Sequence, residues 1–266
     1  MAMESYGLVA GHPARRGQLR YSGHVHRAGQ ALTETKIRSR PERLPVGMLL
    51  AGVGGFLDAF TFVGYHGVFA NAQTGNIVLL GVDAQAEHWR DALLHIPPIV
   101  TFVLGVGLAH MIAEPKIRAV IRRPTRWVLI AEIVVLVVVA AVPGRAPFGV
   151  VPGAISFVSA AQVSTFRSLN GVKYTSTIST GNLRDLTAGF VKWRVGHDQA
   201  ARHQVAILAC IIAAFAAGAG IGGLCTRLIH RLAAWVPAAV LVVVLVTLVM
   251  ETWRLERPDE SQPDGG

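Results

Sequence analysis

Charged residues are scarce in this sequence, and cysteines are scarcer still. Only 15% of the 266 residues are charged, whereas a soluble domain carries about 25%, and 52% are hydrophobic. Long stretches therefore have no charge for water to solvate, which predicts a membrane protein rather than a soluble enzyme. The two cysteines, Cys210 and Cys225, share one apolar stretch. On a continuous helix they would lie roughly 22 Å apart, which excludes a disulfide between them.

The motifs of catalysis and metal binding are also missing. The sequence has no P-loop, no G-x-S-x-G, no H-E-x-x-H and no Cys or His pairs at metal-ligand spacing. We therefore expect no enzyme activity, no cofactor and no metal ion. Residues 1–45 lack both the apolar core of a secretory signal and the apolar content that packs a domain, so we expect a disordered, basic cytosolic tail.

Positive charge is in excess, with a net charge of +9. In a soluble protein this balance would indicate nucleic-acid binding. Here the basic residues stand in short polar segments between apolar runs, which is typical of the positive-inside bias of membrane proteins. The lipid bilayer, and not nucleic acid, is therefore the predicted partner.

Six apolar segments approach the length of about 20 residues that a transmembrane helix needs. We predict spans at residues 46–66, 96–113, 127–143, 149–168, 204–225 and 235–252. They define a transmembrane domain over residues 46–253, followed by a cytosolic tail over residues 254–266. Small residues recur within them, as in Gly47-x-x-x-Ala51-x-x-x-Gly55 and Gly218-x-x-x-Gly222. Such residues let helix backbones approach closely, and we expect packing inside one bundle rather than a dimer contact.

Two polar segments, residues 69–82 and 174–190, are predicted to enter the membrane without crossing it. Each contains Thr-Gly-Asn, as Thr74-Gly75-Asn76 and as Thr180-Gly181-Asn182. Irregular polar backbone at membrane depth must be buried in protein or line a cavity. Further landmarks recur, because Phe102-Val-Leu-Gly105-Val-Gly107 matches Phe215-Ala-Ala-Gly218-Ala-Gly220. The pattern predicts two repeats, residues 46–143 and 149–252, each with three helices and one TGN segment.

The distribution of basic residues favours six spans over eight. With six, both termini are cytosolic together with the cluster Lys116, Arg118, Arg122, Arg123 and Arg126, as the positive-inside rule requires. With eight, this cluster would lie outside. Three spans per half give the halves opposite orientations, an arrangement common in secondary transporters. The predicted fold is an all-α membrane protein of about six helices in two inverted repeats, each with a re-entrant or broken TGN segment.

The TGN tripeptides suit the start of a short helix, because Thr or Asn can cap free N–H groups and Gly permits a sharp turn. The N-terminus of such a helix carries partial positive charge and can bind an anion or a polar group. The alternative is a cap and a close helix crossing without a ligand. Together with Asn71, the two tripeptides are candidate substrate-binding residues.

Asp58 lies in the middle of the first span, where a carboxylate costs about 2.5–3.5 kcal/mol on insertion scales. It is either a proton- or cation-coupling site or a buried hydrogen-bond partner of a neighbouring helix. Gln162 lies near the corresponding place in the second half and completes the candidate set. Glu132 and His110, which are close to predicted span ends, are expected to extend to the membrane interface.

Arg184 and Asp185 directly follow the second TGN tripeptide. They could pair with each other or with Asp58. We favour a third interpretation, in which they mark the cytosolic end of a half-helix.

Two runs of the first half carry a family resemblance, Gly55-Phe-Leu-Asp58-Ala-Phe and Val68-Phe-Ala-Asn71-Ala-Gln-Thr74-Gly75-Asn76-Ile-Val-Leu-Leu-Gly81. They resemble the signature of the YoaK family of bacterial membrane proteins, and Gln162 and Ser179-Thr180-Gly181-Asn182 resemble the second repeat of that family. The resemblance covers residues 45–252. It implies a six-span protein of the bacterial inner membrane and no established activity.

The expected function is passive or proton-coupled passage of a small polar solute or ion, as in a transporter or channel. Asp58 and the TGN segments would line the route. One alternative is a non-transporting membrane scaffold or sensor, whose polar centre only fixes helix packing. A third is a membrane enzyme that acts on lipid. The oligomeric state is not predicted.

Overall fold

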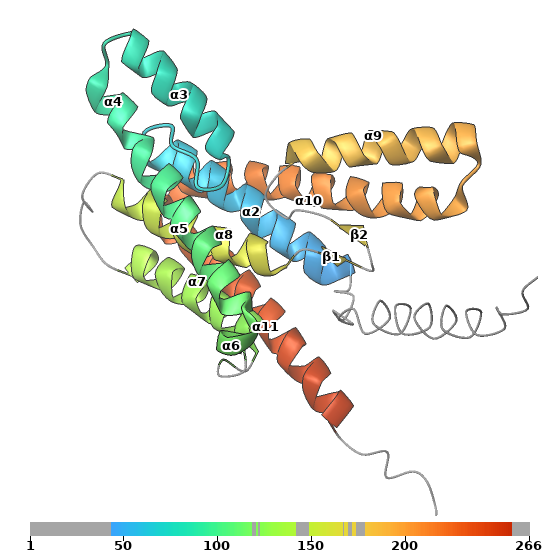
Figure 1. Ribbon diagram of the computed structural model, residues 1–266. Coiled ribbons are helices and arrows are strands. Elements are labelled where there is room, and N and C mark those ends of the chain that lie inside the picture. The colour runs from blue at the N-terminus through green and yellow to red at the C-terminus, as the bar shows by residue number, and fades with distance from the viewer. Residues whose placement is uncertain are drawn as a thin grey trace, which may run out of the picture. The chain divides into compact units, whose positions relative to one another are not determined.

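The computed structural model describes residues 44–118, 121, 123–141, 149–166, 168–169, 172–173 and 179–256. These residues are almost entirely helical (Figure 1). The predicted N-terminal tail lies outside the described residues up to residue 43, and the predicted C-terminal tail lies outside them beyond residue 256. Helix α2 already begins at Leu44, and α11 continues to Glu256, so the helices extend slightly into both predicted tails.

Each of the six predicted spans falls on one helix. In chain order these are α2 (Leu44–Gly64), α5 (Ile96–Ala113), α7 (Pro124–Ala141), α8 (Val150–Thr165), α10 (Gln199–Ile229) and α11 (Trp235–Glu256). The other elements are α3 (Gln73–Gln85), α4 (Trp89–Leu94), α6 (Pro115–Arg118), α9 (Ser179–Gly196), the 3-10 helix η1 (His230–Ala234) and an antiparallel pair, β1 (Ser168–Leu169) and β2 (Val172–Lys173).

Four stretches of the described chain are long and apolar enough to cross a membrane. They are Leu44–Gly64, Trp89–Ala113, Pro124–Ala141 and Gln199–Trp253. The last covers 55 residues and contains two helices, α10 and α11, which η1 separates. Helix α8 is apolar but has only 16 residues, and it ends at Thr165, short of its predicted end at residue 168.

Helices from the two halves of the chain pack against each other in pairs. Helix α2 packs along α10 and α5 packs along α8, while α11 contacts both α2 and α7 (Figure 1). Glycines let the backbones of α2 and α10 approach closely. A Cβ atom on Gly55 would collide with the Phe215 carbonyl, and one on Gly218 with the Gly52 carbonyl. The small residues therefore pack helices within one bundle, as the sequence predicts.

The repeated F-x-x-G-x-G motif has the same division of roles in both halves. Its first glycine is packed, since a Cβ atom on Gly105 would collide with the Phe157 carbonyl of α8, just as Gly218 meets α2. Its second glycine is open, since a Cβ atom on Gly107 or Gly220 would have no atom of the described residues within 4 Å.

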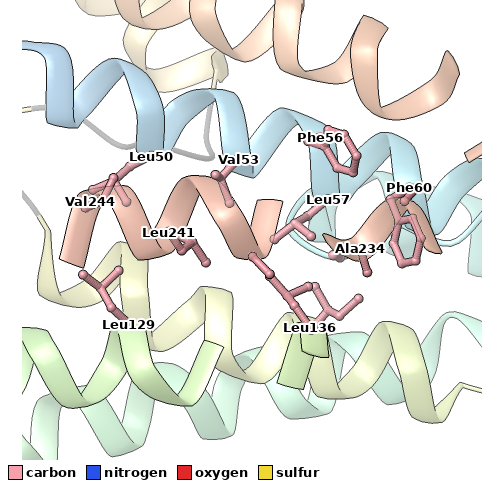
Figure 2. Packing of buried hydrophobic residues seen from close by; sticks show 14 of the residues in the cluster. Leu50, Val53, Phe56, Leu57, Phe60, Leu129, Leu136, Ala234, Leu241 and Val244 are labelled. Carbon is pink, nitrogen blue, oxygen red and sulfur yellow. The ribbon is translucent and has the colours of Figure 1, made fainter. Parts of the chain in front are cut away.

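The main apolar cluster lies where α2, α7, α11 and η1 meet. Figure 2 shows α11 between α2 and α7, with Leu241 of α11 among Leu57, Leu129 and Leu136. All four leucines are fully buried. Among apolar helices this packing stabilises through van der Waals contact rather than through exclusion of water.

Helices α9 and α10 form a hairpin at residues 197–198. The Asp198 carboxylate caps α10, accepting hydrogen bonds from the N–H groups of Ala200 (2.9 Å) and Ala201 (3.3 Å). The guanidinium carbons of Arg194 and Arg202 lie 5.6 and 5.8 Å from the centre of the Trp193 ring. This cap and these cation–π contacts hold the end of the hairpin together.

Candidate functional site

Asp58 of α2 holds the start of α3. Its side chain is only 5% exposed, and its Oδ1 accepts hydrogen bonds from the backbone N–H groups of Asn71 (2.6 Å) and Ala72 (3.3 Å). Ala72 is the N-cap residue of α3, and no side chain of the segment itself caps this helix. The expectation that Thr74 or Asn76 caps the first TGN helix is therefore wrong, and the Asp58 carboxylate instead binds the N–H groups of the two residues that precede α3.

Asn71 lies along α2 beside Asp58. Its Nδ2 donates to the carbonyl of Gly54 (3.3 Å), one turn before Asp58 on the same helix. The residue is 3% exposed, and its Oδ1 accepts no hydrogen bond from the described residues. A buried acceptor without a donor is uncommon in folded proteins and calls for an explanation.

Asn76 of the first tripeptide holds the backbone of Phe69, and Gly75 lies against the Phe69 ring. The fully buried Asn76 side chain accepts from the Phe69 N–H (2.9 Å) and donates to the Phe69 carbonyl (2.8 Å). A Cβ atom on Gly75 would lie 2.9 Å from the Phe69 ring, so this position has no room for a side chain. Thr74 is exposed. Asn76 and Gly75 thus have clear structural roles, whereas Thr74 makes no such contact.

Hydrogen bonds continue from α3 to α8 and α5. Gln73 Nε2 donates to the Ala70 carbonyl (2.7 Å) and to Ser156 Oγ of α8 (3.0 Å). The Ser156 hydroxyl donates in turn to the Pro98 carbonyl of α5 (2.8 Å). The polar group formed by Asp58, Asn71, Gln73, Asn76 and Ser156, called the α3 polar cluster below, therefore connects four helices.

His95 joins the α3 polar cluster from the junction of α4 and α5, and sequence reasoning missed it. The imidazole is buried, with Nδ1 3.4 Å from Asn76 Oδ1 and Nε2 3.2 Å from Asp83 Oδ2. Both residues, His95 and Asp83, lie between the predicted TGN segment at residues 69–82 and the predicted span at residues 96–113, in a part of the chain for which no site was predicted. The available signal was an aspartate and a histidine 12 residues apart, at the two ends of the segment that contains α4, and this spacing is too common to single out a contact.

A second buried polar group lies between α7 and α8. Glu132 is fully buried, and its two carboxylate oxygens accept from Ser159 Oγ (3.2 Å) and from Gln162 Nε2 (2.7 Å). The expectation that Glu132 extends to the interface is wrong, because α7 begins at Pro124 and Glu132 lies near its middle. His110, in contrast, is exposed on α5. Gln162 is buried as a site residue would be, but its side chain donates to Glu132 and not to Asp58.

The second TGN tripeptide also lies in the first turn of a helix, α9. Thr180 is exposed, Gly181 is half-buried and Asn182 is buried. The preceding residues 174–178 lie outside the described part of the chain. Arg184 and Asp185 are largely exposed and pair with each other, at 3.0 Å, and no contact with Asp58 accompanies this pair within the described residues.

The described residues contain no group of three His, Cys, Asp or Glu side chains that could hold a metal ion. The candidate site is instead a hydrogen-bonded polar cluster inside a set of apolar helices. Long apolar helices with a buried polar interior define a chain compatible with a membrane protein.

Residues 46–247 match the DUF1275 family, proteins of unknown function, and the chain belongs to that family. The expectation of an uncharacterised family is thereby confirmed, and the resemblance to the YoaK family stays a prediction. Neither a curated protein nor a solved structure matches the chain.

Proposed function

We propose that this protein passes a small polar solute or ion across the bacterial inner membrane, as a channel or secondary transporter, and is not an enzyme. The observation that carries the proposal is the α3 polar cluster, buried among helices that are apolar enough to cross a membrane. Polar and ionisable side chains at membrane depth are costly, and in membrane proteins they mark solute pathways.

The lengths of α3 and α9 support segments that enter the membrane and do not cross it. Helix α3 has 13 residues and is about 20 Å long, which is shorter than the hydrocarbon core of about 30 Å. Helix α9 has 18 residues but is not among the stretches apolar enough to cross. Both have the TGN tripeptide in their first turn. We infer that both start near the midplane and that the two chain termini are cytosolic.

The packing of the helices supports an inverted repeat. If α2, α3, α5 and α7 correspond to α8, α9, α10 and α11, each contact has a counterpart. Helix α2 packs on α10 as α8 packs on α5, and α7 contacts α8 as α11 contacts α2. The first glycine of each F-x-x-G-x-G motif follows the same correspondence, because Gly105 of α5 lies against α8 as Gly218 of α10 lies against α2. In secondary transporters the solute site lies between such repeats.

The proposal is tested by solute flux into vesicles that contain the purified protein. A panel of small neutral, anionic and cationic solutes is supplied outside, and vesicle volume is followed by light scattering. We expect one class of solute to enter faster than into protein-free vesicles. We expect Asp58→Asn to slow that entry at least tenfold, and Asp185→Asn, which removes the same charge from the exposed pair with Arg184, to leave it unchanged. Entry no faster than into protein-free vesicles for every solute would contradict the proposal.

A scaffold is the second candidate function. The hydrogen bonds of Asp58 favour it, because they hold the backbone at the start of α3 and so have a structural role. Asp58→Asn separates the two candidates, because an amide oxygen at the same place can still accept from the N–H groups of Asn71 and Ala72. If the protein is a scaffold, Asp58→Asn should fold nearly as the unmodified chain does, and neither protein should pass a solute into vesicles.

A further inference from the structure

The geometry at the start of α3 indicates which charge a solute must carry to bind there. This inference rests on the proposed function. A helix N-terminus normally favours an anion, because it carries the equivalent of about half a positive elementary charge. At α3 this place is filled. The N–H groups of Asn71 and Ala72 donate to Asp58, and those of Gly75 (2.9 Å) and Asn76 (3.2 Å) donate to the Ala72 carbonyl.

The balance of charge at this place is negative when Asp58 is ionised. An ionised Asp58 carries a full negative charge, about twice the opposing charge of the helix terminus. Within the described residues no Lys, Arg or His side chain forms an ion pair with Asp58. A second anion would therefore meet net repulsion, whereas a cation would be attracted.

The open acceptor of Asn71 points to the same class of solute. The Asn71 Nδ2 donates to the Gly54 carbonyl. If the nitrogen and oxygen of this amide were exchanged, the amide oxygen would face the carbonyl oxygen of Gly54, which is unfavourable. Oδ1 is therefore the atom without a partner. A buried carbonyl oxygen gains most from an N–H donor or a positive charge.

We propose that the α3 polar cluster binds a small monovalent cation with N–H donors, of the ammonium or guanidinium type, through the Asp58 carboxylate and Asn71 Oδ1. Anions are excluded from this site because Asp58 already occupies the N-terminus of α3. Both protein groups act only as hydrogen-bond acceptors toward the cation.

Three planar solutes of similar size and different charge test the inference: guanidinium, urea and nitrate. Each is supplied at low millimolar concentration, below the range in which guanidinium or urea denatures proteins. Binding is read from the unfolding temperature of the detergent-purified full chain, and passage is read from vesicle flux. We expect guanidinium alone to raise the unfolding temperature and to enter the vesicles.

Two variants connect the effect to the site. Asp58→Asn and Asn71→Leu should each weaken guanidinium binding about tenfold or more, the loss expected when one charge-assisted or buried hydrogen bond is removed. Asp185→Asn should bind guanidinium as the unmodified chain does. Circular dichroism of each variant checks folding, and Asp58→Asn, which keeps an acceptor oxygen, is the variant expected to fold if Asn71→Leu does not.

The outcomes separate this inference from the proposed function. Nitrate entry without guanidinium entry would overturn the inference and leave passage standing. Guanidinium binding without flux of any solute would support the inference and overturn passage. If urea raised the unfolding temperature as much as guanidinium, the site would not distinguish solutes by charge. If folded Asp58→Asn bound guanidinium unchanged, guanidinium would bind elsewhere. Either result would overturn the inference.

Discussion

Glu132 and Gln162 meet between α7 and α8, and each removes the cost of burying the other. The carboxylate of Glu132 accepts from Gln162 and Ser159, so both of its oxygens have a donor away from water. Asp58 differs, since its partners are backbone N–H groups and the neighbouring Asn71 keeps an unused acceptor. At the scale of the residue, the first group is a complete structural contact, whereas the second keeps an acceptor without a donor.

The Glu132 contact predicts non-additive effects on stability. Gln162→Leu leaves a buried carboxylate oxygen without a donor and should lower the free energy of unfolding by about 1–3 kcal/mol. Replacing both residues by leucine should cost less than the sum of the two single changes, because neither an unpaired carboxylate oxygen nor an unpaired amide remains and only the Ser159 hydroxyl loses its acceptor. Denaturant unfolding in detergent micelles measures all three variants. Strictly additive costs would show that the two side chains do not stabilise each other.

At the scale of the element, only one glycine of each F-x-x-G-x-G motif faces the partner helix. Gly105 and Gly218 lie against carbonyl groups of α8 and α2, whereas Gly107 and Gly220 face open space within the described chain. The two glycines of each motif are two residues apart on one helix. They therefore form matched pairs in which the chemical change is identical and only the contact differs.

Alanine substitutions at these glycines should have opposite effects. Gly105→Ala and Gly218→Ala should destabilise by about 1–3 kcal/mol, since the helices must move apart to admit the methyl group. Gly107→Ala and Gly220→Ala should be neutral or stabilise by up to about 1 kcal/mol, because alanine favours the helix. Thermal unfolding in detergent compares the four variants. Equal effects within a pair would mean that the close contact is absent in the membrane protein.

The sequence predicts helices well because apolar length and small-residue spacing are local properties of the chain. The six predicted spans and the starts of α3 and α9 at TGN follow from such properties. The contacts of the site do not. Whether Asp58 reaches Asn71, or Glu132 reaches Gln162, depends on how each helix is rotated about its axis, which packing of the whole bundle decides. For Glu132 an error of three residues in the predicted start of α7 was enough to place it at an interface.

At the scale of the whole molecule, the orientation of the two halves decides the mechanism. Single cysteines at Gln85, the end of α3, and at Gln199, the start of α10, would report it after Cys210 and Cys225 have been replaced. Both positions are exposed. In cells, an impermeant thiol reagent should label Gln85→Cys from outside, and should label Gln199→Cys only after the membrane is opened.

Labelling of both positions only after the membrane is opened would contradict the inverted repeat. In that case α3 and α9 would both cross the membrane, and their N-terminal ends would not approach a common midplane.

The length of α10 has a practical consequence for imaging. Its 31 residues make a helix of about 46 Å, and a tilt of about 20° still leaves roughly 43 Å along the membrane normal. This exceeds a hydrocarbon core of about 30 Å, so α10 extends beyond that core, and we expect the end that the Asp198 cap and the Trp193 contacts hold to α9 to reach the membrane surface. Small membrane proteins are hard to align in electron micrographs because a micelle surrounds them. An antibody fragment bound to the end of this hairpin would give each particle a rigid external marker.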